Sequence, residues 1–183
     1  MITGKRVRLR AVERGDIPCF VEWLNDPEVI EGLMFHLPLS TADEERWFEG
    51  LASYPAEEKP LAIEVQREDS WQLVGNSGFH NVSFNNRSAE IGLFIGEKSI
   101  WDQGYGTETI HLLLRHGFAT LNLNRIYLRV YEHNARAIRC YEKAGFIREG
   151  CLREAVYRHG RYQDEYIMSV LRSEWENKRS QEE

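Results

Sequence analysis

Apolar residues recur along the chain with two periods, one typical of strands and one typical of helices. Short or alternating apolar runs between turn residues predict strands in seven segments. These are residues 7–12, 60–65, 72–82, 89–95, 125–131, 146–156 and 163–171. Apolar residues at steps of three and four predict helices over residues 16–24, 41–51, 104–120 and 135–144.

The order of these elements predicts an α+β fold, in which helices flank a mixed, mostly antiparallel central sheet of about seven strands. A strand–helix–strand crossover is expected over residues 89–131. Asp16 is a candidate helix cap, and Thr41 with Glu44 fits a capping box. Residues 28–40 are open to two interpretations: a loop or short helix lining a substrate pocket, or a packed surface loop.

A glycine-rich turn, residues 101–108, joins the predicted strand 89–95 to the predicted helix 104–120. Gly104 and Gly106 allow a tight backbone because neither carries a Cβ atom. The first N–H groups of the helix lack intrahelical partners and lie at the positive end of its dipole. The turn is therefore a candidate site for phosphate, although a turn of this kind also occurs with a purely structural role.

Two well-known phosphate motifs are excluded at this turn. The dinucleotide pattern G-x-G-x-x-G fails because Thr109 stands in the place of the third glycine. A Walker-type loop fails because no Gly-Lys-Ser/Thr follows.

Composition narrows the classes of protein further. The chain has 183 residues, 42% of them hydrophobic, which suits one domain over residues 1–172 with a polar tail, 173–183, expected to fray. A net charge of −6 argues against nucleic-acid binding. Cys19, Cys140 and Cys151 are odd in number and widely spaced, which favours a reduced, cytoplasmic setting. We expect no membrane segment, because no run approaches about 20 apolar residues.

Two motifs at their mutual distance resemble the GNAT superfamily of acyl-CoA-dependent N-acyltransferases. The first covers residues 103–108, Gln-Gly-Tyr-Gly-Thr-Glu, and the second is Asn134-x-x-Ala137-x-x-x-Tyr141-Glu142-Lys143-x-Gly145-Phe146. The opening Arg8-Leu9-Arg10 and residues 23–29 are similar to the branch that holds ribosomal-protein N-terminal and spermidine acetyltransferases. The similarity extends over residues 7–171. Trp101 is a departure, since the superfamily usually has Gln or Arg there.

The resemblance implies acetyl-CoA as cosubstrate, with its pyrophosphate on the glycine turn and its pantetheine arm along the end of the strand 89–95, where that strand diverges from 125–131. The residues it implies for cofactor binding are Leu93, Phe94, Ile95, Gln103, Gly104, Tyr105, Gly106, Thr107, Asn134, Ala137 and Tyr141. From the residues alone, Leu93–Ile95 also fit a plain core strand, and Asn134 fits a helix cap.

The resemblance also implies two catalytic roles. Tyr141 is the candidate acid that protonates the departing thiolate, and Glu90 is the candidate base that deprotonates the amine, directly or through water. Without the resemblance, Tyr141 is also well explained as a half-buried aromatic residue. Glu90 is equally well explained as a solvated glutamate at the end of a strand. We expect no acyl-cysteine at Cys140, because no His–Asp pair accompanies it, and no metal.

Three hypotheses about function remain open. The first is an N-acetyltransferase that moves an acetyl group to a primary amine by direct attack in a ternary complex. The second is a catalytically silent coenzyme A-binding sensor or scaffold, and the third is a small binding protein with a structural glycine turn. The acceptor is a protein N-terminus, a polyamine or another small amine, recognised by residues 28–40 and 155–165. Whether the chain forms a homodimer is left open.

Overall fold

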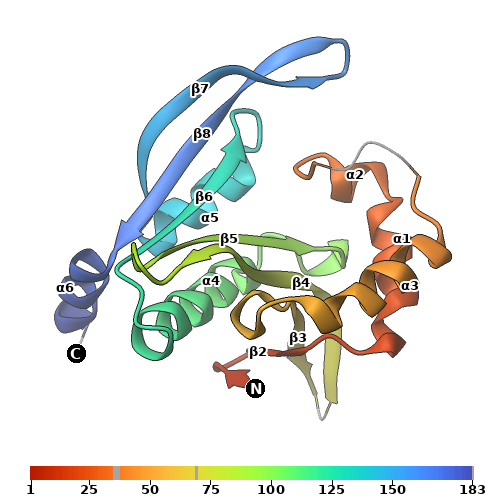
Figure 1. The fold of residues 1–183 in the computed structure, drawn as a ribbon, viewed down its shortest axis with the longest axis horizontal. Coiled ribbons are helices and arrows are strands. Elements are labelled where there is room, and N and C mark those ends of the chain that lie inside the picture. Colours follow the sequence, from red (N-terminus) through yellow and green to blue (C-terminus); the bar gives the residue numbers. More distant parts are fainter. Residues whose placement is uncertain (35–37, 69, 183) are drawn as a thin grey trace.

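A sheet of eight strands runs through the computed structural model, which describes residues 1–34, 38–68 and 70–182 (Figure 1). Side by side, the strands are β1 (Ile2–Thr3), β2 (Val7–Ala11), β3 (Leu61–Arg67), β4 (Ser70–Ser83), β5 (Ser88–Ile95), β6 (Arg125–Tyr131), β8 (Arg161–Leu171) and β7 (Ile147–Arg158). Neighbouring strands are antiparallel, except that β5 and β6 are parallel. The predicted fold class is confirmed, and the two-residue β1 is the strand that the pattern did not indicate.

Helices cover both faces of this sheet. They are α1 (Ile17–Leu24), α2 (Pro27–Ile30), α3 (Thr41–Gly50), α4 (Tyr105–Arg115), α5 (Ala135–Ala144) and α6 (Arg172–Glu182), with short helical turns η1 (Arg14–Asp16), η2 (Leu51–Ser53), η3 (Ala56–Glu58), η4 (Lys98–Ile100) and η5 (His116–Thr120). On β3, Ile63 belongs to the main core with residues of α4 and α5, whereas Ala62 packs with Phe20 of α1. Because successive strand residues face opposite sides, α4 and α5 lie on one face and α1 and α3 on the other.

The parallel strands β5 and β6 stay together for three residue pairs: Ser88 with Arg125, Ala89 with Ile126 and Glu90 with Tyr127. Beyond Glu90 the two strands separate, as the ribbon shows (Figure 1). The predicted divergence is therefore present. It leaves the main-chain groups of the last part of β5 without a strand partner on that side, so they are available to another molecule.

The α3 helix begins with a different cap from the predicted one. Ser40 is the cap, and its hydroxyl accepts a hydrogen bond from the Asp43 N–H at 3.1 Å while the Asp43 carboxylate accepts from the Ser40 N–H at 3.0 Å. Thr41 is the first helical residue, and Glu44 is buried at 5% exposure. The capping box is thus shifted by one residue, because Glu44 lies on the inward side of the helix.

The polar tail, expected to fray, is helical up to residue 182 as part of α6. Trp175 packs on Phe118 with ring centroids 5.3 Å apart, and Arg172 donates to the carbonyl oxygens of Phe118 and Leu123. The polar helix α6 is therefore attached to the rest of the protein through its few inward-facing residues. Residue 183 lies outside the described residues.

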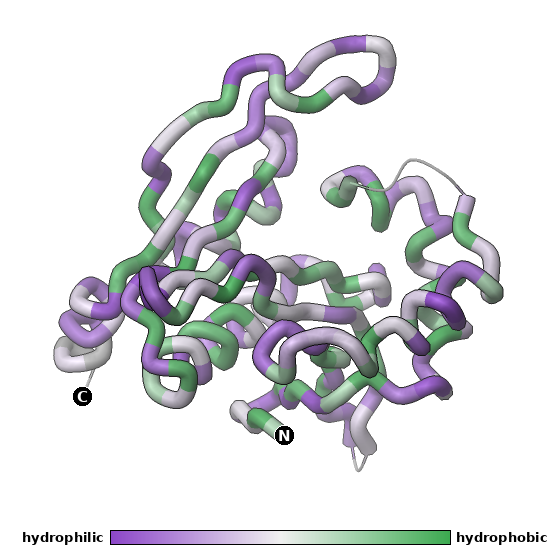
Figure 2. The backbone as a smooth tube through the Cα atoms, in the orientation of Figure 1, coloured by the Kyte–Doolittle hydropathy of each residue, from purple (hydrophilic) through white to green (hydrophobic). Residues whose placement is uncertain are grey.

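The ambiguous segment 28–40 contains the end of α2, and residues 35–37 within it lie outside the described residues. Figure 2, coloured by residue hydropathy, shows hydrophobic and hydrophilic residues interspersed along the described chain. No helix in the described part of the chain is both long and apolar enough to cross a membrane. The same residues hold no cluster of three or more His, Cys, Asp or Glu side chains placed for a metal ion.

Candidate active site

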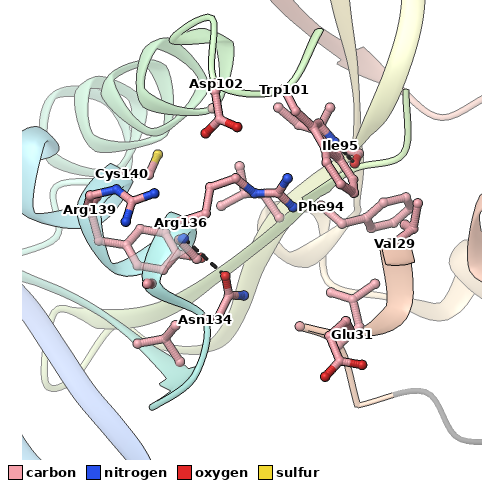
Figure 3. Close-up of a pocket in the computed structure, with 18 of the residues that line it drawn as sticks. Val29, Glu31, Phe94, Ile95, Trp101, Asp102, Asn134, Arg136, Arg139 and Cys140 are labelled. Atoms are coloured by element: carbon pink, nitrogen blue, oxygen red, sulfur yellow. Dashed lines mark hydrogen bonds between the residues drawn. The ribbon is translucent and has the colours of Figure 1, made fainter. Parts of the chain in front are cut away.

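A cavity of about 810 Å³ opens where β5 and β6 separate. One wall is the start of α4, a second is one side of α5, and a third is the end of β5. Residues 27–33, around α2, form the wall opposite α5 (Figure 3). Of the predicted site residues, all except Gln103 and Glu90 line this cavity.

The start of α4 presents main-chain N–H groups that have no acceptor within the helix. Gly104 caps the helix with φ of +85°, a left-handed conformation that side chains with a Cβ atom rarely adopt. The N–H groups of Tyr105, Gly106 and Thr107 follow directly and have no intrahelical acceptors. Gln103 is outside the cavity, since its side-chain amide donates to the Ser99 carbonyl oxygen at 2.8 Å. The turn therefore offers main-chain donors after Gln103, an arrangement that suits an anion.

The α5 helix brings a second N-terminus and three cations to the cavity. The Asn134 side chain accepts from the Ala137 N–H at 3.1 Å, so it acts as the predicted helix cap. Arg136, Arg139 and Lys143 follow at steps of three and four and line the cavity from α5 (Figure 3). These cations were not among the predicted site residues, although their helical spacing beside the second motif was a usable signal.

Trp101, the departure from the superfamily pattern, has two contacts in the cavity wall. Its indole N–H donates to the Ile95 carbonyl oxygen at 2.8 Å. The Arg136 guanidinium carbon lies 3.6 Å from the centre of a Trp101 ring, in a cation–π contact (Figure 3). The tryptophan thus fastens the end of β5 and holds a cation beside the anion site, where the superfamily usually places a polar or basic side chain.

The side chains at the end of β5 pack against the protein interior; these residues are Leu93, Phe94 and Ile95. Leu93 and Ile95 pack against the core on the α4 and α5 side. Phe94 lies edge-on to Phe20 of α1, with ring centroids 6.2 Å apart. Their main-chain groups face the gap left by β6. Both interpretations of these residues, core strand and ligand edge, are compatible.

Tyr141 lines the cavity from α5 and is 9% exposed. Burial raises the pKa of its phenol above the ordinary value, so the group keeps its proton across the physiological range. Its neighbour Cys140 lies with Sγ 3.4 Å from the Thr107 hydroxyl oxygen, and burial raises the pKa of that thiol. A raised pKa disfavours the thiolate and therefore a cysteine nucleophile.

Glu90 lies on β5 outside the cavity lining. Its carboxylate accepts hydrogen bonds from Arg129 Nε and Asn81 Nδ2, each at 3.0 Å. Arg129 does line the cavity, and it also lies 3.8 Å from the carboxylate of Glu165. Burial raises the pKa of Glu165. Glu90 is thus connected to the cavity through Arg129.

Comparison with known proteins gives consistent matches. The acetyltransferase (GNAT) domain family matches residues 6–147. The spermidine N(1)-acetyltransferase of Vibrio cholerae is 31% identical over 175 residues, which is 96% of this chain and 98% of that protein. A Bacillus subtilis protein with a provisional ribosomal N-acetyltransferase name, YdaF, is 33% identical over 107 residues, 58% of each chain.

The fold matches solved structures as well. A crystal structure of the Vibrio cholerae spermidine N-acetyltransferase in complex with CoA and spermine superposes with a TM-score of 0.85 at 28% identity. The superposition covers 95% of this chain and 100% of that one.

Proposed function

This chain belongs to the GNAT family of acetyltransferases, and from that premise we propose that it moves the acetyl group of acetyl-CoA to a primary amine by direct attack in a ternary complex. The observation that carries the proposal is the cavity itself. It joins an anion site at the α4 N-terminus, an unpaired strand edge on β5 and a buried neutral phenol, with a separate wall opposite them.

The residues of the cavity fit coenzyme A. The N–H groups of Tyr105, Gly106 and Thr107 and the α5 cations suit its phosphates. The open edge of β5 suits the amide-rich pantetheine arm, which pairs with main-chain groups as another strand does. One N–H group on this edge holds the thioester oxygen as negative charge develops on it.

The reaction forms a C–N bond, breaks a C–S bond and moves two protons. The attacking amine must be neutral, so its ammonium form first loses a proton to the base, which we assign to Glu90, directly or through a water beside Arg129. Tyr141 then donates its proton to the sulfur of the leaving group. The buried phenol suits this role because it stays protonated until the leaving group needs the proton.

The acceptor we propose is an amine such as spermidine, which the name of the Vibrio cholerae relative gives, or a protein N-terminus. It enters past the wall of residues 27–33. This placement leaves the α4 side to the cofactor and permits both substrates to be bound together, as direct attack requires.

Two measurements test the proposal. Coenzyme A should raise the melting temperature, because a ligand at about 100 times its dissociation constant adds about 2.7 kcal/mol of stability. Thiol release from acetyl-CoA should then appear with some members of a panel containing spermidine, a peptide with a free N-terminus, an aminoglycoside and an amino sugar, and should match the acetylated amine formed. The N-acetylated form of each amine is the control.

The outcomes separate the three hypotheses. Stabilisation by coenzyme A without thiol release on any amine contradicts the transferase and leaves a silent coenzyme A-binding module. Absence of stabilisation contradicts both and leaves a glycine turn with a structural role.

Arg136→Ala is expected to lower the affinity for coenzyme A about tenfold, which corresponds to about 1.4 kcal/mol. The guanidinium lies beside the anion site and supplies charge-assisted hydrogen bonds, although its exposure to solvent limits their strength. Titration calorimetry with coenzyme A measures the change, and Arg153→Ala, an exposed arginine of β7, is the matched control. Equal affinities of the two variants would exclude Arg136 from the phosphate site.

A further inference from the structure

The wall of residues 27–33 lies across the cavity from α4 and α5, where we place the cofactor. It has little secondary structure of its own. Within it, α2 spans only Pro27–Ile30. A helix of one turn does not hold its own shape in water, so its position depends on contacts with the rest of the protein. At its start, Lys98 pairs with the carboxylates of Asp26 and Glu28 at 2.7 and 2.8 Å, but these are exposed pairs, which contribute little.

At its end, the wall is held by Arg158 from the far end of β7. This guanidinium donates to the carbonyl oxygens of Ile30 at 2.7 Å, Glu31 at 2.9 Å and Leu33 at 2.6 Å. Ile30 is the last residue of α2, and Glu31 and Leu33 lie beyond it, where carbonyl oxygens lack the donors of a continuing helix; the Ile30 oxygen also accepts from the Leu33 N–H at 2.9 Å. One planar cation therefore satisfies three of them at once, which a lysine cannot do with the same geometry.

The Arg158 side chain is buried, with 8% of the residue exposed, and its guanidinium carbon lies 5.9 Å from the centre of the Tyr131 ring. A buried cation is costly unless its hydrogen bonds are made, so leaving these carbonyls is unfavourable. The adjacent histidine contacts, from His133 and His159 to Glu31, are at 3.0–3.5 Å and partly exposed. These contacts also hold Glu31 of the wall, in addition to the hydrogen bonds of Arg158.

The same end of the wall also fits closely against the N-terminus of α5. A Cβ atom at Gly32 would overlap Nδ2 of Asn134, the cap of α5. The wall and the α5 N-terminus are thus in direct contact, and a small shift of residues 27–33 changes the width of the cavity at the acceptor side. Arg158 itself is not among the cavity-lining residues.

We infer that Arg158 is a positioning residue for the acceptor: by binding three main-chain carbonyls of the wall, it sets the distance between the acceptor and the bound cofactor. The inference rests on the proposed transferase function. It assigns to the β7–β8 hairpin, which extends away from the rest of the sheet, a role in acceptor binding exerted through α2 (Figure 1).

The test is steady-state kinetics on Arg158→Met, which keeps the length and apolar stem but removes the donors. The KM for the amine should rise on the order of tenfold, while the KM for acetyl-CoA and the affinity for coenzyme A stay within about twofold of the wild type, because misplacement of one wall affects one substrate. Arg158→Lys should give an intermediate KM for the amine. Arg153→Met, at an exposed position of β7 outside the cavity lining, is the matched control and should resemble the wild type.

Hydrogen exchange of the amides in residues 27–34 provides a second measurement that needs no activity. Arg158→Met should exchange faster there than Arg153→Met, with unchanged protection in α4. An unchanged KM for the amine, or equal losses for both substrates, overturns the inference. If the wild type acetylates no amine, the proposed function fails and the acceptor role with it, while exchange still decides whether Arg158 holds the wall.

Discussion

Tyr141→Phe is expected to lower kcat by about one to three orders of magnitude while leaving the affinity for coenzyme A nearly unchanged, on the scale that general acids contribute. The substitution removes one oxygen and keeps the ring that packs with Phe146, at a centroid distance of 6.0 Å. Without the phenol, the leaving thiolate departs unprotonated, and an unperturbed thiol pKa of about 8.5 makes this unfavourable at neutral pH.

The raised pKa of Tyr141 makes a second consequence measurable. Because burial holds the phenol in its neutral form, the activity of the wild type should not fall as pH rises through the ordinary range of tyrosine pKa values.

The control for the Tyr141→Phe substitution is Tyr162→Phe, which removes a hydroxyl from a residue with 64% exposure in the hairpin. A Tyr141→Phe variant with the turnover of Tyr162→Phe would remove Tyr141 from the mechanism.

Local patterns were sufficient for most of the fold. The strict alternation of residues 125–131 predicted β6 at its observed bounds, and Asn134 with Gly145 marked both ends of α5, because caps and period are properties of neighbouring residues. The α3 cap was misplaced by one residue because Ser40 and Thr41 are both good caps. Composition alone does not indicate that α6 packs on Phe118 through one inward residue, Trp175.

The sequence predicted the parts of the site that local main-chain geometry forms. It did not predict the parts that depend on contacts between side chains far apart in the sequence. Gly104 identified the anion turn, since its φ of +85° is a local requirement. The contact of Arg136 with Trp101 joins α5 to the turn before α4, and Arg158 reaches carbonyls 125 to 128 residues earlier. Such contacts depend on which elements fold together. For the same reason the sequence placed Glu90 at the strand end but not its pairing with Arg129.

Gly104→Val is expected to weaken the binding of coenzyme A by about two orders of magnitude. A β-branched residue at a φ of +85° is strained, so the turn must change its conformation and the N–H groups after it no longer converge on one anion. Loss of two charge-assisted hydrogen bonds costs about 3 kcal/mol, or about two orders of magnitude in affinity. Calorimetry and the thermal shift with coenzyme A both measure this loss.

Strain at a left-handed glycine lowers stability wherever it occurs, so the control must carry the same strain elsewhere. Gly160 has a φ of +78° in the turn between β7 and β8, and a Cβ atom there would meet no atom of the described residues within 4 Å beyond its chain neighbours. Gly160→Val should therefore keep the affinity for coenzyme A. If both variants lose the cofactor, the effect is general destabilisation. If Gly104→Val still binds coenzyme A as tightly as Gly160→Val, the phosphates do not lie on the α4 N-terminus. If Gly104→Val alone loses affinity for coenzyme A, the result supports the proposal that main-chain N–H groups bind the cofactor.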